Sequence, residues 1–225
     1  MMNRDLIYNL LRFTLSSDSR PDFNVFRNVK ENEWEWAFET FSIHGVTPIV
    51  YDLFERMPEE VRPPRDVLMK FISANFGAQR SYVKLQGVSA KLEEVMKAND
   101  IKCFLLKGLS LAEYYPRRES RKFLDIDLYA PGAESKVDNA FKDKGVKVDT
   151  DFYRHSHMSI AGVLVENHHC LLDVRGRKGM LELDSDLKKM AQKHLDLFDS
   201  PGLYYPDADF SLIFNLHHAL SHFIY

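Results

Sequence analysis

The chain has few of the features that define several common protein classes. Its 225 residues include only two cysteines, Cys103 and Cys170, too few for a disulfide framework or a cysteine metal cluster. It lacks an apolar run of about 18 residues, the length that a membrane-spanning helix needs. The N-terminal apolar stretch is interrupted by Asp5, Asn9 and Arg12, unlike the apolar region of a signal peptide. We therefore expect a protein of the reducing cytoplasm with no membrane segment.

The charge is also nearly balanced. The 30 lysine and arginine residues against 33 aspartate and glutamate residues give a formal net charge of -3, so no broad basic surface for nucleic acid is expected. Hydrophobic residues make up 45% of the chain, which is enough to bury the core of one large domain or two small ones.

The spacing of apolar residues predicts helices at both ends of the chain. In the N-terminal part it favours helices over 29–44 and 48–56, then one long helix from Asp66 to Met96 with Gly77 and Gly87 as weak points. In the C-terminal part it favours helices over 185–197 and 209–225. The last helix ends without a recognisable cap, which is the pattern of a chain cut within a helical region.

Between these helices the pattern changes to a mixture of strands and helices. Strands are predicted over 101–106, 123–129, 146–148, 157–165 and 168–174, and helices over 108–115 and 134–144. The last two strands are expected to form a hairpin that turns at Glu166 and Asn167. We therefore expect an α/β (α+β) fold with an N-terminal helical region (1–100), a mixed β-sheet core flanked by helices (101–177) and a C-terminal helical segment (178–225).

The clearest chemical feature is the pair Asp125 and Asp127 on the strand predicted over 123–129. Residues two apart on a strand point to the same face, so the two carboxylates share one small volume. A cation offsets their repulsion, and Mg²⁺ suits one or two carboxylates together with substrate phosphates. An Asp-x-Asp pair is also common as two solvated surface acids.

A second feature lies between the predicted strand over 101–106 and the helix that follows it. Lys107 and Gly108 stand at this turn, and Ser110 follows in the helix. Gly108 permits close backbone approach, and a helix N-terminus with a nearby lysine or hydroxyl can bind phosphate. The alternative is an ordinary strand-to-helix turn with an incidental lysine.

Together these residues resemble a known family. Leu106-Lys107-Gly108, Leu111 to Pro116, Arg121 and Asp125-Ile126-Asp127-Leu128 resemble the uncharacterised nucleotidyltransferase family of the DNA polymerase β-like superfamily. The resemblance is densest from Phe104 to Leu128, and it implies a nucleotidyltransferase-like sheet core.

The resemblance implies a Mg²⁺-dependent (or Mn²⁺-dependent) enzyme that moves a nucleoside monophosphate from an NTP to a hydroxyl group. Asp125 and Asp127 would bind the metal, and Asp173 is our candidate for the third carboxylate of the superfamily. Lys107, Gly108, Ser110 and Arg121 would contact the nucleotide, whereas Arg117 and Arg118 fit a solvated loop equally well. The acceptor, a small molecule, a protein or an RNA end, is not indicated, and neither is the oligomeric state.

Several positions depart from the family pattern. Leu109 stands where the superfamily prefers a small residue, and Leu124 where this family usually has glycine. Family members often have a histidine two residues after the third carboxylate, but Arg175 follows Asp173 at that distance and suits a structural salt bridge with it. These departures favour an alternative: a catalytically weakened member of the fold that binds a nucleotide or a protein.

Two further interpretations compete with the enzyme. Histidines cluster in the C-terminal third, among them His155, His157, His168, His169, His217, His218 and His222. His218 and His222 have the spacing of a helical zinc pair, but Ala219 replaces the glutamate of the zinc-protease motif, so packing or substrate-pocket roles are favoured. The aromatic N-terminal helices suggest a helical interaction protein, in which Trp34 and Trp36 are either core or interface residues. A core position is favoured for Trp34.

Overall fold

The computed structural model describes residues 3–16, 21–175 and 178–224, without the side chains of residues 178 and 221–224. Its contacts divide the chain into two compact units. The first, which we call the helical unit, comprises Met1–Val83 and Tyr115–Phe123. The second, the sheet unit, comprises Lys84–Tyr114 and Leu124–Tyr225.

The helical unit is built around an aromatic core. Its helices are α1 (Arg4–Leu15), η1 (Phe23–Phe26), α2 (Glu31–Ile43), α3 (Thr47–Phe54), η2 (Glu59–Val61), the first part of α4 (Arg65–Ala98) and η3 (Arg118–Ser120). Trp34 is 1% exposed and packs in the cluster that contains Phe54 and Phe71, whose rings meet edge to face with centroids 4.8 Å apart. The interpretation of Trp34 as a core residue is therefore confirmed.

Helix α4 is one helix of 34 residues, and neither Gly77 nor Gly87 breaks it. Its first part belongs to the helical unit and its second part to the sheet unit, because the division falls between Val83 and Lys84. Buried residues such as Phe71, Leu85 and Leu92 recur along it at helical spacing. Packing of this apolar stripe outweighs the low helix propensity of the two glycines.

The sheet unit contains a six-stranded mixed sheet in the order β3-β4-β5-β2-β1-β6. The strands are β1 (Lys102–Leu106), β2 (Asp125–Tyr129), β3 (Val148–Asp149), β4 (His155–Ile160), β5 (Val163–His168) and β6 (Gly202–Tyr204). Strand β2 is antiparallel to β1 and parallel to β5, so it lies at the centre with a partner on each side.

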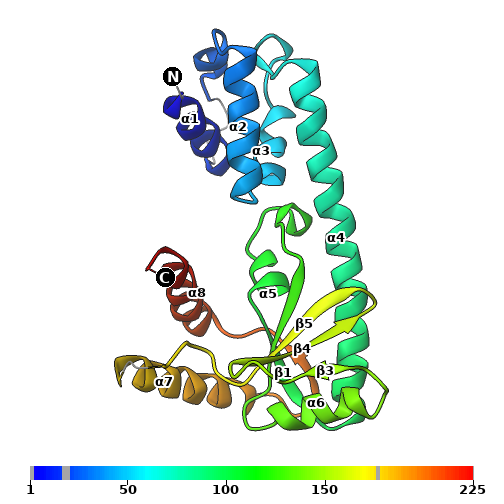
Figure 1. Cartoon of the computed structure of the whole chain (residues 1–225). Helices are drawn as coiled ribbons and strands as arrows, with labels where there is room; N and C mark the ends of the chain where they lie inside the picture. Colours follow the sequence, from blue (N-terminus) through cyan, green and yellow to red (C-terminus); the bar gives the residue numbers. More distant parts are fainter. Residues whose placement is uncertain (1–2, 17–20, 176–177, 225) are drawn as a thin grey trace. The chain divides into compact units, whose positions relative to one another are not determined.

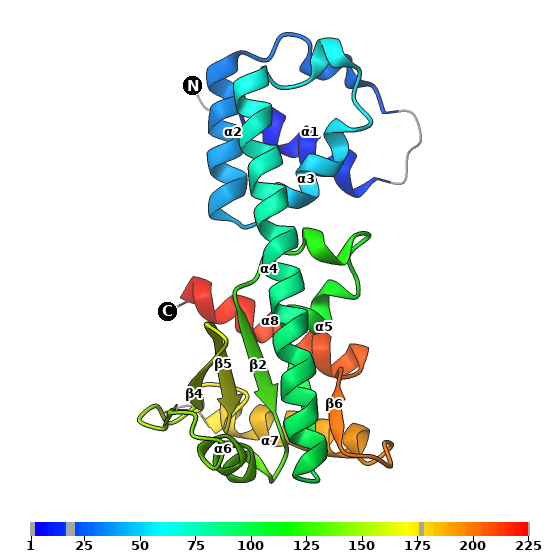
Figure 2. The ribbon, with the colours of Figure 1, turned by 90° about the vertical axis from the view of Figure 1, so that its right-hand side faces the viewer.

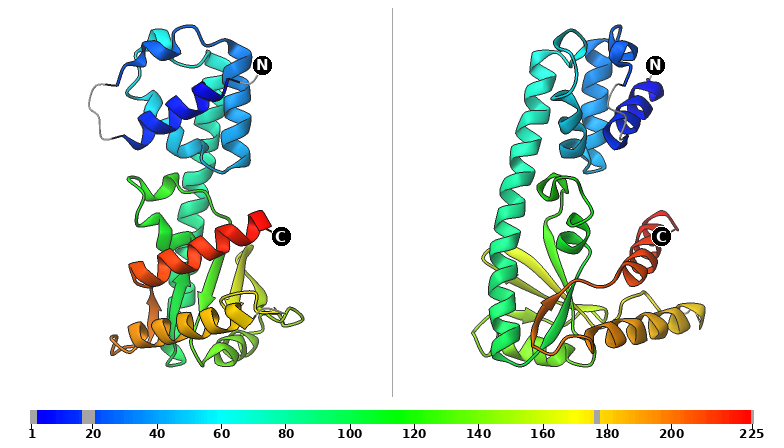
Figure 3. Two further views of the ribbon diagram at one scale, coloured as in Figure 1. Left: turned by 90° about the vertical axis from the view of Figure 1, so that its left-hand side faces the viewer. Right: turned by 180° about the vertical axis from the view of Figure 1, so that it is seen from behind.

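Helices cover both faces of this sheet (Figures 1, 2 and 3). They are the second part of α4, α5 (Gly108–Ala112), α6 (Glu134–Lys142), α7 (Lys178–Leu195) and α8 (Ala208–Ile224). Helices α7 and α8 pack on the face of β1 and β2 that carries Phe104, Leu106 and Tyr129. Helix α4 lies on the opposite face (Figure 3, right). The sheet is therefore the middle layer of this unit, and the expected α+β fold is confirmed.

The hairpin of β4 and β5 turns at Ala161 and Gly162, so the predicted turn at Glu166 and Asn167 is wrong. Both loop residues have positive φ, 50° and 71°, as a two-residue type I′ turn requires. Residues 169–174 are not a strand. This shift places Glu166 within β5, where its side chain alternates with those of Val165 and Asn167.

No helix in the described ranges is long and apolar enough to cross a membrane.

Candidate metal and nucleotide site

The register of the sheet gathers polar side chains on one face. Asp127 on β2 is the partner of Glu166 on the parallel strand β5. Across the hairpin, His157 is the partner of Glu166, and His155 is the partner of His168. Paired residues of neighbouring strands point to the same face, so two acids and three imidazoles meet there.

Asp127 is at the centre of this group. Its side chain is 2% exposed, and its Oδ1 lies 2.7 Å from Lys107 Nζ and 2.9 Å from His168 Nε2. Burial alone would raise the pKa of Asp127, but the hydrogen bond from His168 and the positive charge of Lys107 outweigh burial and lower it. Asp127 is therefore a buried carboxylate held in its ionised form.

Lys107 reaches Asp127 from a strained turn between β1 and α5. Its backbone angles, φ of 47° and ψ of -116°, lie in a region that residues other than glycine rarely adopt. The next residue, Gly108, opens α5, a helix of only five residues. Such outliers persist where the surroundings impose them, and they cluster at functional sites. With this backbone conformation, the ammonium group of Lys107 reaches back to Asp127 on β2.

The hydroxyl of Ser110, which was expected to contact the nucleotide, is used within the turn itself. Its side chain is buried and its Oγ donates a hydrogen bond of 2.9 Å to the carbonyl oxygen of Lys107. In this arrangement the hydroxyl supports the strained turn. Leu109 is buried as well, whereas Leu124, just before β2, is 69% exposed.

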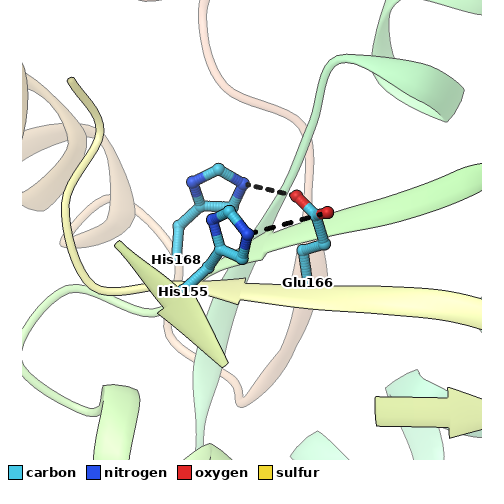
Figure 4. Close-up of side chains that lie close together, drawn as sticks. All are labelled: His155, Glu166 and His168. Atoms are coloured by element: carbon cyan, nitrogen blue, oxygen red, sulfur yellow. Dashed lines mark ion pairs between the residues drawn. The ribbon is translucent and has the colours of Figure 1, made fainter. Parts of the chain in front are cut away.

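Glu166 lies among the histidines (Figure 4). Its Oε1 is 3.7 Å from His155 Nε2 and 3.5 Å from His157 Nε2, and its Oε2 is 3.7 Å from His168 Nε2. The pKa of His155 is lowered to about 4, first by burial and then by the neighbouring His168 and His157. A neutral imidazole is the form that binds metal ions.

The predicted carboxylates are placed differently from one another. Asp125 is two residues before Asp127 on β2 and half-buried, as the strand prediction required. Asp173 lies in the loop after β5, with its side chain 40% exposed. Its pKa is lowered, first by the hydrogen bond from Arg175 and then by that from Tyr153. Asp173 therefore has the salt bridge that the sequence suggested as its alternative role.

The predicted arginines belong to the helical unit. The guanidinium of Arg121 lies over the ring of Phe123, 5.2 Å from its centroid. Arg117 forms an ion pair with Asp52, which gives it a structural partner. Arg121 as a phosphate ligand stays a prediction from sequence.

The remaining histidines lie outside the group around Glu166. His169 Nε2 is 3.6 Å from Asp138, and His217 Nε2 is 3.1 Å from the sulfur of Met180. His218 stacks near Phe214. The suggested zinc pair includes His222, whose side chain lies outside the described part of the structure.

Two sets of donors on this face are suited to cations. Asp125, Asp127 and Glu166 place three carboxylates on two neighbouring strands, an oxygen donor set that fits Mg²⁺ or Mn²⁺. The ligand atoms of His155, Glu166 and His168 lie within 4.8 Å of one another. Both sets share Glu166. Among the described residues, the ligand atoms of the second set converge, and the first set has the oxygen chemistry that Mg²⁺ prefers.

Glu166 is absent from the site residues predicted from the sequence, because the turn was predicted at this position. Two signals were available. Val163, Val165 and Asn167 alternate with Glu166 and His168, which is strand periodicity. In addition, His168 follows Glu166 by two residues, the spacing that the resembling family shows after its third carboxylate.

A mixed sheet between helices is consistent with a nucleotidyltransferase-like α+β fold. The model of the family described as "Uncharacterised nucleotidyltransferase" matches residues 30–225, and the chain belongs to that family. The searches of curated proteins and of solved structures gave no match. Membership supports nucleotidyltransferase activity in general terms.

Proposed function

We propose that this protein is a Mg²⁺-dependent nucleotidyltransferase that moves a nucleoside monophosphate from an NTP to a hydroxyl group of an acceptor. The observation that carries the proposal is the register of β2 and β5, which sets Glu166 beside Asp127. Asp125, Asp127 and Glu166 are the proposed metal ligands. Glu166 takes the role that the sequence analysis gave to Asp173.

The chain's residues have separate tasks in this proposal. The carboxylates would orient the triphosphate through Mg²⁺, which when bound neutralises phosphate charge. Lys107, at the strained turn, would contact a phosphate oxygen, and Gly108 leaves room for it. The acceptor oxygen bonds to the α-phosphorus, the bond from that phosphorus to pyrophosphate breaks, and the hydroxyl proton passes to solvent.

The cytoplasm is the compartment that we propose. Cys103 and Cys170 are both free thiols, and burial raises the pKa of Cys103 to about 12. Two unpaired cysteines are usual in a reducing compartment.

An Asp125→Asn, Asp127→Asn double variant tests the function. The unchanged protein should bind NTP in the presence of Mg²⁺, release pyrophosphate and transfer label from the α-phosphate, whereas label at the γ-phosphate should stay with pyrophosphate. The double variant should lose these reactions by a factor of about 100 or more. Equal activity in the two proteins would refute the proposed site.

The same experiment tests the alternative function. The exposed Leu124 and the inward-facing hydroxyl of Ser110 suit a nucleotide-binding protein that has lost efficient transfer. Mg²⁺-dependent NTP binding by the unchanged protein, without pyrophosphate release for any acceptor tried, favours this alternative.

A further inference from the structure

The face of β4 and β5 carries nitrogen donors in a position where the proposed nucleotidyltransferase chemistry uses only oxygen donors. His155 and His168 come from neighbouring strands and are register partners. Their Nε2 atoms are each 3.7 Å from an oxygen of Glu166. Figure 4 shows both rings turned toward this carboxylate.

We infer that His155, Glu166 and His168 form a binding site for a divalent transition-metal ion, of which Zn²⁺ is the preferred test case. The site does not depend on nucleotide transfer. Two histidines and one carboxylate are a known ligand set for catalytic zinc, with a position left open for water or substrate.

The distances fit a single ion. Metal bonds of about 2.1 Å place two ligands of one ion roughly 3–4 Å apart. The contacts of Glu166 with His155 and His168 are within this range, and the three ligand atoms lie within 4.8 Å of one another. Small side-chain rotations that move each ligand atom by less than about 1 Å would bring the three atoms into one coordination sphere.

The orientation of His168 also fits. Its Nδ1 lies 3.4 Å from the carbonyl oxygen of Cys170. Its Nε2 faces Asp127 and Glu166, and in the metal-free protein it donates to Asp127. When Nε2 binds a metal ion, the ring proton moves to Nδ1, which then donates to the carbonyl oxygen, because a carbonyl oxygen only accepts. In metal-binding histidines, the N–H of the other ring nitrogen commonly donates a hydrogen bond to a carbonyl oxygen in this way.

The donor set distinguishes this site from a magnesium site. Imidazole nitrogen suits Zn²⁺, whereas Mg²⁺ prefers oxygen ligands in octahedral geometry. Asp127 Oδ1 lies 2.9 Å from His168 Nε2 and also contacts the ammonium of Lys107, whereas Glu166 lies 3.7 Å from both His155 and His168. His157 lies at the rim, with its side chain 35% exposed.

The test measures metal binding by the full chain without nucleotide. After chelator treatment, equilibrium dialysis against Zn²⁺ and elemental analysis should find one tightly held ion per chain that excess Mg²⁺ does not displace. Replacement by Co²⁺ should give a visible absorption spectrum characteristic of nitrogen and oxygen ligands. Failure to hold Zn²⁺, or its displacement by Mg²⁺, would overturn the inference.

Variants locate the ion. His155→Ala and His168→Ala should each lower the Zn²⁺ affinity by about tenfold or more, and His155→Ala should alter the Co²⁺ spectrum. His169→Ala is the matched control, because His169 is the next residue after His168 but faces Asp138, and it should bind as the unchanged protein does. Equal Zn²⁺ affinity in the unchanged protein and both test variants would place the ion elsewhere and contradict the site.

Two controls separate the possible failures. Glu166→Gln keeps the shape of the side chain while it removes the charge, so it should weaken Zn²⁺ binding even if an alanine variant fails to fold. Mg²⁺-dependent NTP binding is measured separately on the Zn²⁺-free protein. NTP binding without Zn²⁺ binding overturns this inference alone, and Zn²⁺ binding without NTP binding overturns the proposed function alone.

Discussion

At the scale of single residues, Lys107 combines an unfavourable backbone conformation with a favourable ion pair. Its φ of 47° suits glycine, yet its ammonium group lies 2.7 Å from the buried Oδ1 of Asp127. Glycine would relieve the backbone strain at this position, whereas lysine adds the ion pair with Asp127.

Two substitutions of Lys107 separate these effects. Both Lys107→Ala and Lys107→Gly remove the ion pair, but only Lys107→Gly relieves the backbone. We expect Lys107→Gly to be more stable than Lys107→Ala by about 1 kcal/mol, measured by urea unfolding. Both variants should bind Mg-NTP more weakly than the unchanged protein. Equal stability of the two variants would show that the turn is not strained.

His155 gives the metal-free protein a defined pH dependence. Its pKa is about 4 in the folded state, below the ordinary value of 6.5, with burial as the main cause. Between these values the unfolded chain binds the proton more readily, so the free energy of unfolding falls as the pH drops through this window. Above it, His155 is neutral in both states and makes no such contribution.

His155→Phe should therefore lose less stability than the unchanged protein when the pH falls from about 7 to about 5. Urea unfolding in the presence of a chelator measures the difference. If the two proteins show the same pH dependence, His155 is not held in its neutral form by the fold.

At the scale of elements, the sequence predicts helices and strands correctly where the spacing of apolar residues is strongly periodic. It fails where two neighbouring apolar segments could each form the strand. The long helix α4 and strand β2 with Asp125 and Asp127 follow from spacing alone. The hairpin does not, because the apolar residues at 170–172 imitate a strand, whereas Leu171 and Leu172 pack under α7. The short strand β6, which pairs with β1, carries too few residues for a pattern.

The site was predictable to the same extent. The acids of β2 were identified because two residues on one strand suffice to place them together. The pairing of Asp127 with Glu166 joins two strands whose partner residues are 39 positions apart in the sequence. The turn at Ala161 and Gly162 sets where β5 begins, and it lacks the asparagine or aspartate that usually marks such a turn in a sequence.

Helix α6 is attached to the hairpin by a buried polar network. Asp138 Oδ1 accepts hydrogen bonds of 2.5 Å from Ser156 and 2.8 Å from Asn167, and its side chain is nearly buried. Asp138→Ala removes the acceptor of the Ser156 hydroxyl and leaves Asn167 with its bond to the Glu134 carbonyl, so the free energy of unfolding should fall by about 1–3 kcal/mol in a urea titration. Asp138→Asn, which keeps one acceptor oxygen, should lose less. A neutral effect of Asp138→Ala would contradict the network.

The glycines of α4 give a prediction of opposite sign. Gly87 is exposed, and an added methyl group would meet nothing within 4 Å. Gly87→Ala should therefore raise the free energy of unfolding by about 0.5–1 kcal/mol through helix propensity. A thermal or urea titration measures this gain, and a loss of stability would mean that the position needs glycine for contact.

At the scale of the whole molecule, the described residues of the candidate site belong to the sheet unit, apart from Arg121. The sheet unit is formed from two separate stretches of chain, with Tyr115–Phe123 assigned to the helical unit. The family match runs from residue 30 to residue 225 and so includes most of both units. The family match therefore covers most of the helical unit, including α2, α3 and the first part of α4.

The central claim is that Glu166, in register with Asp127, completes the carboxylate site. Titration calorimetry of Mg-NTP with the unchanged protein, Glu166→Gln and Asp173→Asn tests this claim most directly. Both variants remove one charge from residues after β2, which makes them a matched pair. The account predicts that Glu166→Gln lowers NTP affinity by at least about tenfold while Asp173→Asn leaves it unchanged. Loss of binding in Asp173→Asn with full binding in Glu166→Gln would contradict it.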